Sequence, residues 1–217
     1  MDIVFQVGEP RGAGDGPVGH SGGFVVGAMT RPLLVDAGSR AEFFGVRFRP
    51  GRARLFLDML ASELTDGSAG LENFWGGEGR SLYHRLCELS SAAARVREVE
   101  KQLLRRLPRH PRADPYVEAM VERVLRSRGS APVASLARLA GVSRQHLGNL
   151  FAAWVGVRPK LFSRVIRFQA LLQQIGTAKA VDWSAAAADL GYSDQAHLIA
   201  DFRALTGVTP ERYRAGA

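Results

Sequence analysis

The sequence predicts an α+β protein: a small antiparallel β-sheet or partial barrel with helices comes first, and an all-α domain with two helix-turn-helix motifs follows. Three observations predict this fold class. Short β-prone runs with glycine turns fill the first fifty residues, helical periodicity dominates after them, and one pattern occurs twice beyond residue 134. The length of 217 residues and the 46% hydrophobic content suit one large or two small domains.

The N-terminal region of about 1–50 reads as strands. The β-prone runs are 2–7, 24–29, 33–35 and 43–48. A glycine- and proline-rich loop covers 8–19, and Pro50-Gly51 marks a turn. A full jelly roll takes about eight strands. The predicted barrel is therefore incomplete, completed by another chain, or shortened by a start assigned too late.

Helical patterns occupy 52–107. One helix is expected over Arg52–Leu64, a short apolar link over 71–75, and two helices within 80–107. The apolar stripes of the last two are Leu82, Leu86, Leu89, Val96, Val99, Leu103 and Leu104. These stripes either pair two chains or pack against the chain's own sheet, and the pattern fits both.

Composition narrows the class of protein. No apolar run is long enough to span a bilayer, and the N-terminus shows no signal-peptide pattern, so we expect a cytoplasmic protein. The single cysteine, Cys87, has no internal disulfide partner and is expected to be a buried small hydrophobe. No cofactor or metal site is expected, because no phosphate-binding loop, nucleophile elbow or zinc-ligand spacing occurs.

Basic charge is concentrated in the C-terminal part. Residues 1–94 hold 9 Lys/Arg and 11 Asp/Glu, 95–112 hold 7 and 2, and 113–217 hold 13 and 8. This distribution favours a nucleic-acid partner for the C-terminal part. The prolines of 108–115 mark the boundary, so we expect an N-terminal domain at 1–108, a linker at 109–115 and a C-terminal domain at 116–217.

The repeated pattern predicts two helix-turn-helix units. The copies read Ala137-x-x-Ala140-Gly141-Val142-Ser143 and Ala187-x-x-Leu190-Gly191-Tyr192-Ser193, each followed by Leu-x-x-x-Phe and Gly-Val-x-Pro. The glycines end one helix, and Ser143 and Ser193 are candidate N-caps of the next. From Leu147 and Leu198 onward the offset grows from fifty to fifty-one residues, so the second turn has one extra residue. In such units the second helix enters the DNA major groove.

Residues 134–214 resemble the DNA-binding domain of AraC/XylS-type transcription regulators. The resemblance rests mainly on the second copy, in the runs 186–198, Phe202-Arg203 and 206–214. The N-terminal half loosely resembles the cupin-like domains that precede such modules, most closely at 45–51. The resemblance implies a sequence-specific, non-enzymatic transcription regulator, either an activator or a repressor. It also implies that 116–217 binds double-stranded DNA and that 1–108 is a sensor or dimerisation domain. Further candidate partners are RNA polymerase, a small-molecule effector and a second copy of the chain, bound as a homodimer through 80–107.

The expected site lies on the two recognition helices, at 143–155 and about 194–205. Base-reading candidates are Arg144, Gln145, Asn149 and Gln195. Phosphate-binding candidates are Ser143, Arg158, Lys160, Arg164 and Arg203. Gly148 stands where the resemblance implies a longer polar side chain. Ala200 stands where it implies an arginine, and Asp194 and Asp201 are expected to bring negative charge near phosphates. The first motif is therefore expected to carry most of the specificity.

Other interpretations stay open. An alanine-rich second helix also suits an interaction module with degenerate DNA binding. An alkyltransferase-like enzyme would need Cys87 to be reactive, with His84 beside it on the helix. Aromatic candidates for an effector pocket, or simply for the core, are Phe24, Phe44, Phe48 and Trp75. His197 is expected to pack against and orient the second turn.

Overall fold

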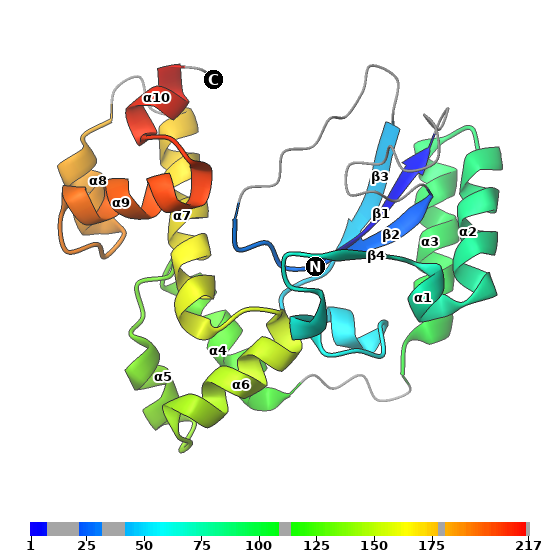
Figure 1. Ribbon diagram of the computed structural model, residues 1–217, viewed down its shortest axis with the longest axis horizontal. Helices are drawn as coiled ribbons and strands as arrows, with labels where there is room; N and C mark the ends of the chain where they lie inside the picture. The colour runs from blue at the N-terminus through cyan, green and yellow to red at the C-terminus, as the bar shows by residue number, and fades with distance from the viewer. Residues whose placement is uncertain (8–21, 32–41, 109–113, 178–180, 216–217) are drawn as a thin grey trace. The chain divides into compact units, whose positions relative to one another are not determined.

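A computed structural model shows two compact units, one built mainly from residues up to Asp114 and the other from Pro115 onward (Figure 1). It describes residues 1–7, 22–31, 42–108, 114–177 and 181–215, and the side chains of Leu139 and Thr177 are also left out. The predicted strand at 33–35, the loop at 8–19 and most of the predicted linker lie outside the described residues. The predicted α+β class is confirmed, with an antiparallel sheet followed by an all-helical part.

Four antiparallel strands form the sheet in the order β3-β1-β2-β4. Their bounds are β1 (Asp2–Val7), β2 (Gly23–Val26), β3 (Glu42–Arg47) and β4 (Ser68–Gly70). Asp2 lies opposite Arg47, whose Nη2 donates to the carboxylate at 3.0 Å. The fourth strand was not predicted, because Ser-Ala-Gly has little intrinsic β preference and forms a strand through its pairing with β2.

The N-terminal core lies between the sheet and two helices, α2 (Gly77–Glu88) and α3 (Ala92–Arg106). Ile3 and Phe5 alternate with outward residues along β1 and point into this core, as a strand with one covered face requires. Leu82 and Leu86 of α2 are fully buried in the same cluster. The two helices lie side by side along the sheet (Figure 1), which confirms the two helices predicted within 80–107.

The single helix predicted over Arg52–Leu64 is wrong. Two short 3₁₀ helices, η1 (Ala53–Leu55) and η2 (Ala61–Leu64), take its place. Helical geometry stops after Phe56. The carbonyl of Phe56 accepts a hydrogen bond at 2.9 Å from the indole of Trp75, the last residue of the short helix α1 (Glu72–Trp75). The break buries Leu57 to 1% exposure and leaves Leu60 40% exposed, so tertiary packing overrides the local helical pattern.

Cys87 is exposed, so the expected core cysteine is also wrong. The buried face of α2 passes through Leu82 and Leu86, and the next residue is turned about 100° around the helix axis. Burial raises the pKa of the neighbouring Tyr83 to about 12, with a smaller contribution from its hydrogen bond to Cys87.

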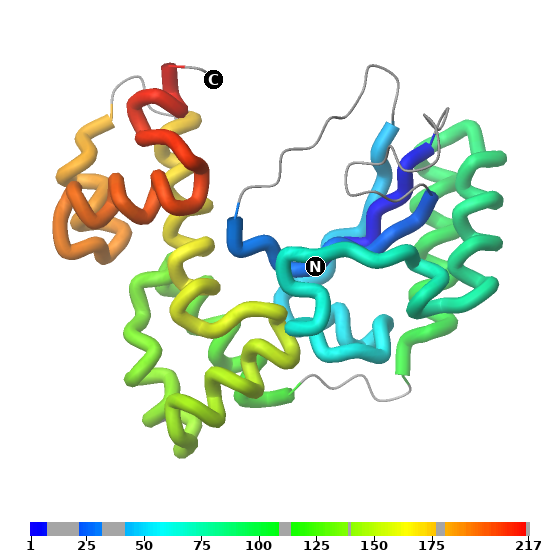
Figure 2. The backbone as a smooth tube through the Cα atoms, viewed as in Figure 1, coloured from blue at the N-terminus to red at the C-terminus, as the bar shows by residue number. Residues whose placement is uncertain are grey.

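The C-terminal unit is all helical, as predicted. Its helices are α4 (Pro115–Arg126), α5 (Val133–Leu139), α6 (Arg144–Val155), α7 (Pro159–Thr177), α8 (Trp183–Asp189), α9 (Gln195–Thr206) and α10 (Pro210–Ala215). The long helix α7 connects the pair α5 and α6 at one end to α8, α9 and α10 at the other (Figure 2). Among the described residues, no helix combines the length and apolar character needed to cross a bilayer.

Candidate nucleic-acid interface

The turns of the two helix-turn-helix motifs have the same backbone geometry. Gly141 and Gly191 both adopt the left-handed region, with φ of 65° and 71°. The amide of the following residue then donates back to the preceding helix, from Val142 to Ala137 at 3.2 Å and from Tyr192 to Ala187 at 2.9 Å. This is the hydrogen-bond pattern of a glycine-terminated helix. The duplication seen in the sequence is therefore a duplication of three-dimensional structure.

The N-caps explain the one-residue offset between the copies. Ser143 Oγ accepts the amide of His146 at 3.1 Å and caps α6, as predicted. Asp194, and not Ser193, caps α9, because its carboxylate accepts the amide of His197 at 2.7 Å. That hydrogen bond is the main cause of the lowered pKa of Asp194. Ser193 is the extra residue of the second turn, and its hydroxyl donates to the Asp194 carboxylate at 3.1 Å.

The core of the first motif determines which side of α6 faces outward. Leu147 and Phe151 are buried, and the Phe151 ring packs on Phe162 of α7 with centroids 5.3 Å apart. The three base-reading candidates of this motif, Arg144, Gln145 and Asn149, are all exposed. Within the described part of the chain, none of the three side chains has a hydrogen-bond partner, so their polar groups face solvent.

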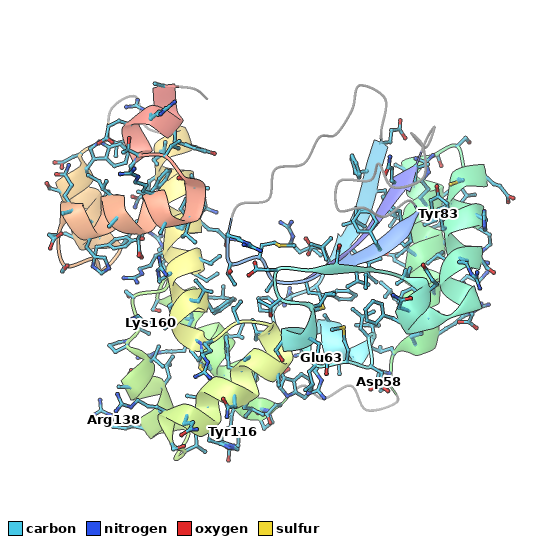
Figure 3. The ribbon with its side chains drawn as sticks, in the orientation of Figure 1. Asp58, Glu63, Tyr83, Tyr116, Arg138 and Lys160 are labelled. Atoms are coloured by element: carbon cyan, nitrogen blue, oxygen red, sulfur yellow. The ribbon has the colours of Figure 1, made fainter. Side chains whose placement is uncertain are left out.

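A basic side chain lies against α6 where the sequence has glycine. A Cβ placed on Gly148 would lie 3.7 Å from Nη1 of Arg158, so this guanidinium occupies the surface that a longer side chain would cover. Arg158 and Lys160 are both exposed at the start of α7. Figure 3 labels Lys160 in this position, together with Arg138 on α5. A cationic group of Arg158 therefore lies beside the position where the resemblance implies a longer polar side chain.

The second motif presents a different face. Leu198 and Phe202 are buried, and the Phe202 ring contacts those of Phe168 and Tyr213 edge-on at 5.2 and 5.5 Å. Gln195 is half-buried, and its Oε1 accepts a hydrogen bond from Ser184 of α8 at 3.1 Å. Small side chains occupy the exposed side of α9. A shallow surface hollow is lined there by Ala196, Ile199, Ala200, Arg203, Ala204 and Thr209.

His197 lies over the second turn. Its ring contacts that of Tyr192 edge-on with centroids 5.2 Å apart, and its Nδ1 lies 3.1 Å from the hydroxyl of Ser193. These contacts join the N-terminus of α9 to the turn before it, in keeping with the packing role expected for this histidine. No metal-ligand arrangement of His, Cys, Asp and Glu occurs among the described residues.

Asp201 is a correction to the expected site. It is only 8% exposed, so its charge does not lie at the surface near phosphates. Its Oδ1 accepts from Nε of Arg164 at 2.9 Å, and its Oδ2 lies 3.9 Å from Nη2 of Arg167. Arg164, expected at phosphates, thus holds a partner inside the protein. No local pattern in the sequence pointed to this pairing, because Asp201 lies thirty-seven residues further along the chain.

Two family models match the chain. Residues 136–216 match the family described as a helix-turn-helix domain, and 1–69 match a domain of unknown function, DUF6597. The second match is compatible with a cupin-like N-terminal domain. No curated protein is significantly similar to the chain.

Solved structures of regulator domains are similar to about half of the chain. The C-terminal domain of AraT, a response regulator from Geobacillus stearothermophilus, is 20% identical, with a TM-score of 0.45, over 48% of this chain and 87% of its own. The DNA-binding domain of AdpA, solved with a target DNA, is 25% identical, with a TM-score of 0.43, over 48% of this chain and 93% of its own. A transcriptional regulator with an AraC-type DNA-binding domain, from Chromobacterium violaceum, is 22% identical, with a TM-score of 0.41, over 46% of this chain and 90% of its own.

All three TM-scores are below 0.5, so these likenesses carry no weight in assigning the family. The family match, the duplicated turn geometry and the second-copy sequence all concern the same helices. Residues 136–216 therefore match a helix-turn-helix domain family and fold as two helix-turn-helix motifs, and their sequence resembles the DNA-binding domain of AraC-type transcription regulators.

Proposed function

We propose that the protein is a sequence-specific DNA-binding transcription regulator whose first helix-turn-helix motif carries most of the base readout. One observation carries this proposal: the two recognition helices differ at equivalent positions. Helix α6 begins with Arg144 and Gln145 and has Asn149 further along, where α9 has Gln195, Ala196 and Ala200.

The chemistry of these side chains favours readout by α6. An arginine donates two hydrogen bonds to guanine O6 and N7, and a glutamine or asparagine bridges N6 and N7 of adenine. Gln145 and Asn149 lie four residues apart, one above the other on the exposed side of α6. The alanines of α9 offer only apolar contact with a thymine methyl group. Gln195 keeps its amide nitrogen for a base while its oxygen is held by Ser184.

Phosphate contacts are proposed for the exposed cations. Arg158 and Lys160 stand at the N-terminus of α7, and Arg203 stands on the last turn of α9. Ser143 accepts an amide at the start of α6 and can still donate its hydroxyl hydrogen to a phosphate. Arg164 uses Nε for Asp201, so only the remaining end of its guanidinium is offered to DNA. Such contacts set the position on the duplex and carry no sequence information.

The N-terminal unit is proposed to regulate this binding. A homodimer through 80–107 is favoured by α3, where Val96 is exposed and Leu104 is 70% exposed. A small-molecule effector and RNA polymerase remain proposals for partners. Phe24, Phe48 and Trp75 are buried; Phe48 stacks on Phe56 at 5.2 Å, so these aromatic residues serve the core first.

The alternatives are judged by separate observations. The alanine-rich face of α9 favours an interaction module with degenerate DNA binding. Family and fold point to a regulator rather than an enzyme. Labelling of Cys87 by a thiol reagent would not identify an alkyltransferase-like enzyme, because an exposed cysteine reacts without any catalytic role. Transfer of an alkyl group from damaged DNA to Cys87, detected by mass spectrometry, would identify one.

Selection of bound duplexes from a random DNA library by the full chain tests the proposal. The same substitution is then made on each recognition helix. Gln145→Ala should cost about 1–3 kcal/mol on the selected site and relax one base position, whereas Gln195→Ala should cost much less. If no sequence is enriched, the interaction-module alternative replaces the regulator. If Gln195→Ala relaxes the site more than Gln145→Ala does, readout belongs to the second motif.

A further inference from the structure

The connecting helix α7 holds the second recognition helix by directional polar contacts as well as by apolar packing. Arg164 and Arg167 lie three residues apart, on one side of α7, and both face Asp201 of α9. The Arg164 contact is a hydrogen bond of 2.9 Å, and the Arg167 contact is an ion pair of 3.9 Å. The carboxylate is thus opposed by two guanidinium groups within the protein.

Arg167 also reaches two turns of the domain. Its Nη1 donates to the carbonyl of Gly191 at 3.3 Å, and its guanidinium carbon lies 4.6 Å from the centre of the Tyr192 ring. The start of the side chain passes Gly129, where an added Cβ would lie 2.7 Å from Arg167 Cγ. One arginine of α7 therefore contacts the turn before α5, the turn before α9, and α9 itself through Asp201.

These contacts restrict motions that apolar packing leaves open. Apolar packing between α7 and α9, which includes the edge-on contact of Phe168 with Phe202, is less directional than a charged hydrogen bond and tolerates small rotations and shifts. Hydrogen bonds between charged groups weaken when their geometry changes. The contacts at Asp201, Gly191 and Tyr192 lie at different points of the second motif, so together they hold its orientation on α7.

The cluster is poorly arranged for stability alone. Among the described residues, Nε of Arg167 and Oδ2 of Asp201 are buried without a hydrogen-bond partner. Desolvation of charged groups offsets most of their attraction, and a well-packed apolar cluster is often as stable. In some proteins such clusters specify one arrangement of the packed elements without adding stability.

We propose that Asp201, with Arg164 and Arg167, is a brace that fixes the position of α9 relative to α7 and so sets the number of base pairs between the DNA segments that α6 and α9 contact. The proposal rests on the proposed function, in which both motifs bind one duplex. Each inserted base pair moves a segment by about 3.4 Å along the DNA and by about a tenth of a turn around it. A braced pair of helices accepts one spacing, whereas a loosened pair accepts several. Asp201 is thus a positioning residue and touches no base.

The test measures affinity for the selected site and for versions with one base pair inserted or removed between its two segments. The wild-type full chain should lose about tenfold in affinity on changed spacing, a loss comparable to a mismatched base pair. Asp201→Asn should reduce that loss to threefold or less. The ratio between spacings cancels any general effect of the lost negative charge. Glu122→Gln, which makes the same acid-to-amide change in the ion pair with Arg126 on α4, should keep the tenfold ratio.

Arg164→Met removes the same hydrogen bond from the other side and should also relax spacing, which covers the case in which Asp201→Asn does not fold. An unchanged spacing ratio in a folded Asp201→Asn or Arg164→Met variant would overturn the brace. So would loss of the folded domain in both variants, seen by circular dichroism, because the cluster would then serve folding itself. If the wild-type chain binds a preferred site but shows no spacing preference, the brace is overturned and the proposed function stands. If the wild-type chain has no preferred site, the proposed function itself is overturned.

Discussion

Replacing Gly191 by alanine tests how far the two helix-turn-helix turns are equivalent. Gly141 and Gly191 share the left-handed backbone conformation, in which an alanine costs about 1–2 kcal/mol. Their surroundings differ. A Cβ on Gly141 meets no atom within 4 Å, whereas a Cβ on Gly191 would lie 2.8 Å from Cβ of Ser130. Gly141→Ala is therefore a matched control that carries the backbone cost alone.

The expected loss at Gly191 is the larger of the two. Crowding that forces a close-packed neighbour to shift typically costs about 1–3 kcal/mol, so Gly191→Ala should cost about 2–5 kcal/mol and Gly141→Ala about 1–2 kcal/mol. Removing the opposing Cβ with Ser130→Gly should bring the cost of Gly191→Ala down to that of Gly141→Ala. The difference between the cost of Gly191→Ala in the wild type and its cost in the Ser130→Gly background then measures the free energy of the steric clash.

Urea-dependent hydrogen exchange of the full chain, followed by mass spectrometry, gives the unfolding free energy of the helices beside each turn. Gly141→Ala should destabilise α5 and α6, and Gly191→Ala should destabilise α8 and α9. The reasoning is refuted if the two substitutions cost the same. It is also refuted if Ser130→Gly leaves the cost of Gly191→Ala unchanged, because the close approach of the two residues would then be absent.

Two further predictions concern charge. Arg158→Ala should weaken selected and unrelated DNA alike and lower the slope of log affinity against log salt by about 1, whereas Arg126→Ala, which loses a partner of Glu122, should leave that slope unchanged. The amide of His197 holds the pKa of Asp194 below its usual value, so the stability this contact provides is complete above the unfolded pKa and is lost as pH falls through the folded one. Between about pH 5 and pH 3, the melting temperature of the wild type should therefore fall more than that of Asp194→Asn, because the asparagine keeps an N-cap that does not titrate. Equal falls in the two proteins would contradict this prediction.

The features that the sequence predicted correctly are those set by local chemistry. Glycine at 141 and 191 is where a helix must end in a left-handed residue, and both positions do so. The spacing of Leu147 and Phe151 predicted the buried side of α6, and with it the exposure of Gln145. The cap of α9 differs from the predicted Ser193 because the extra residue of the second turn lies between Gly191 and the cap. The distance from the glycine indicates Ser193, whereas the distance from Leu198 indicates Asp194, the residue that caps the helix.

The features that the sequence did not predict depend on distant partners. Periodicity favoured one helix over Arg52–Leu64, yet the carbonyl of Phe56 bonds to an indole nineteen residues away and the helix stops. Arg164 looks like a phosphate ligand in any local window, because its partner Asp201 is thirty-seven residues further on. Neither propensity nor spacing encodes which acidic residue a given arginine meets. That information exists only once α7 and α9 are packed together.

The burial of Asp201 changes how the second motif is understood. As a surface charge it would repel phosphates and make α9 a poor neighbour for DNA. Held between Arg164 and Arg167 it is neutralised inside the protein, and the exposed side of α9 keeps small side chains and Arg203. Small side chains let a helix approach the bases closely and favour contact with a thymine methyl group, which is a weaker preference than the hydrogen bonds of α6 provide. In the proposed function the sequence repeat thus covers two different roles. Helix α6 offers hydrogen bonds that choose a sequence, and the braced helix α9 adds weaker base preferences at a fixed distance along the duplex.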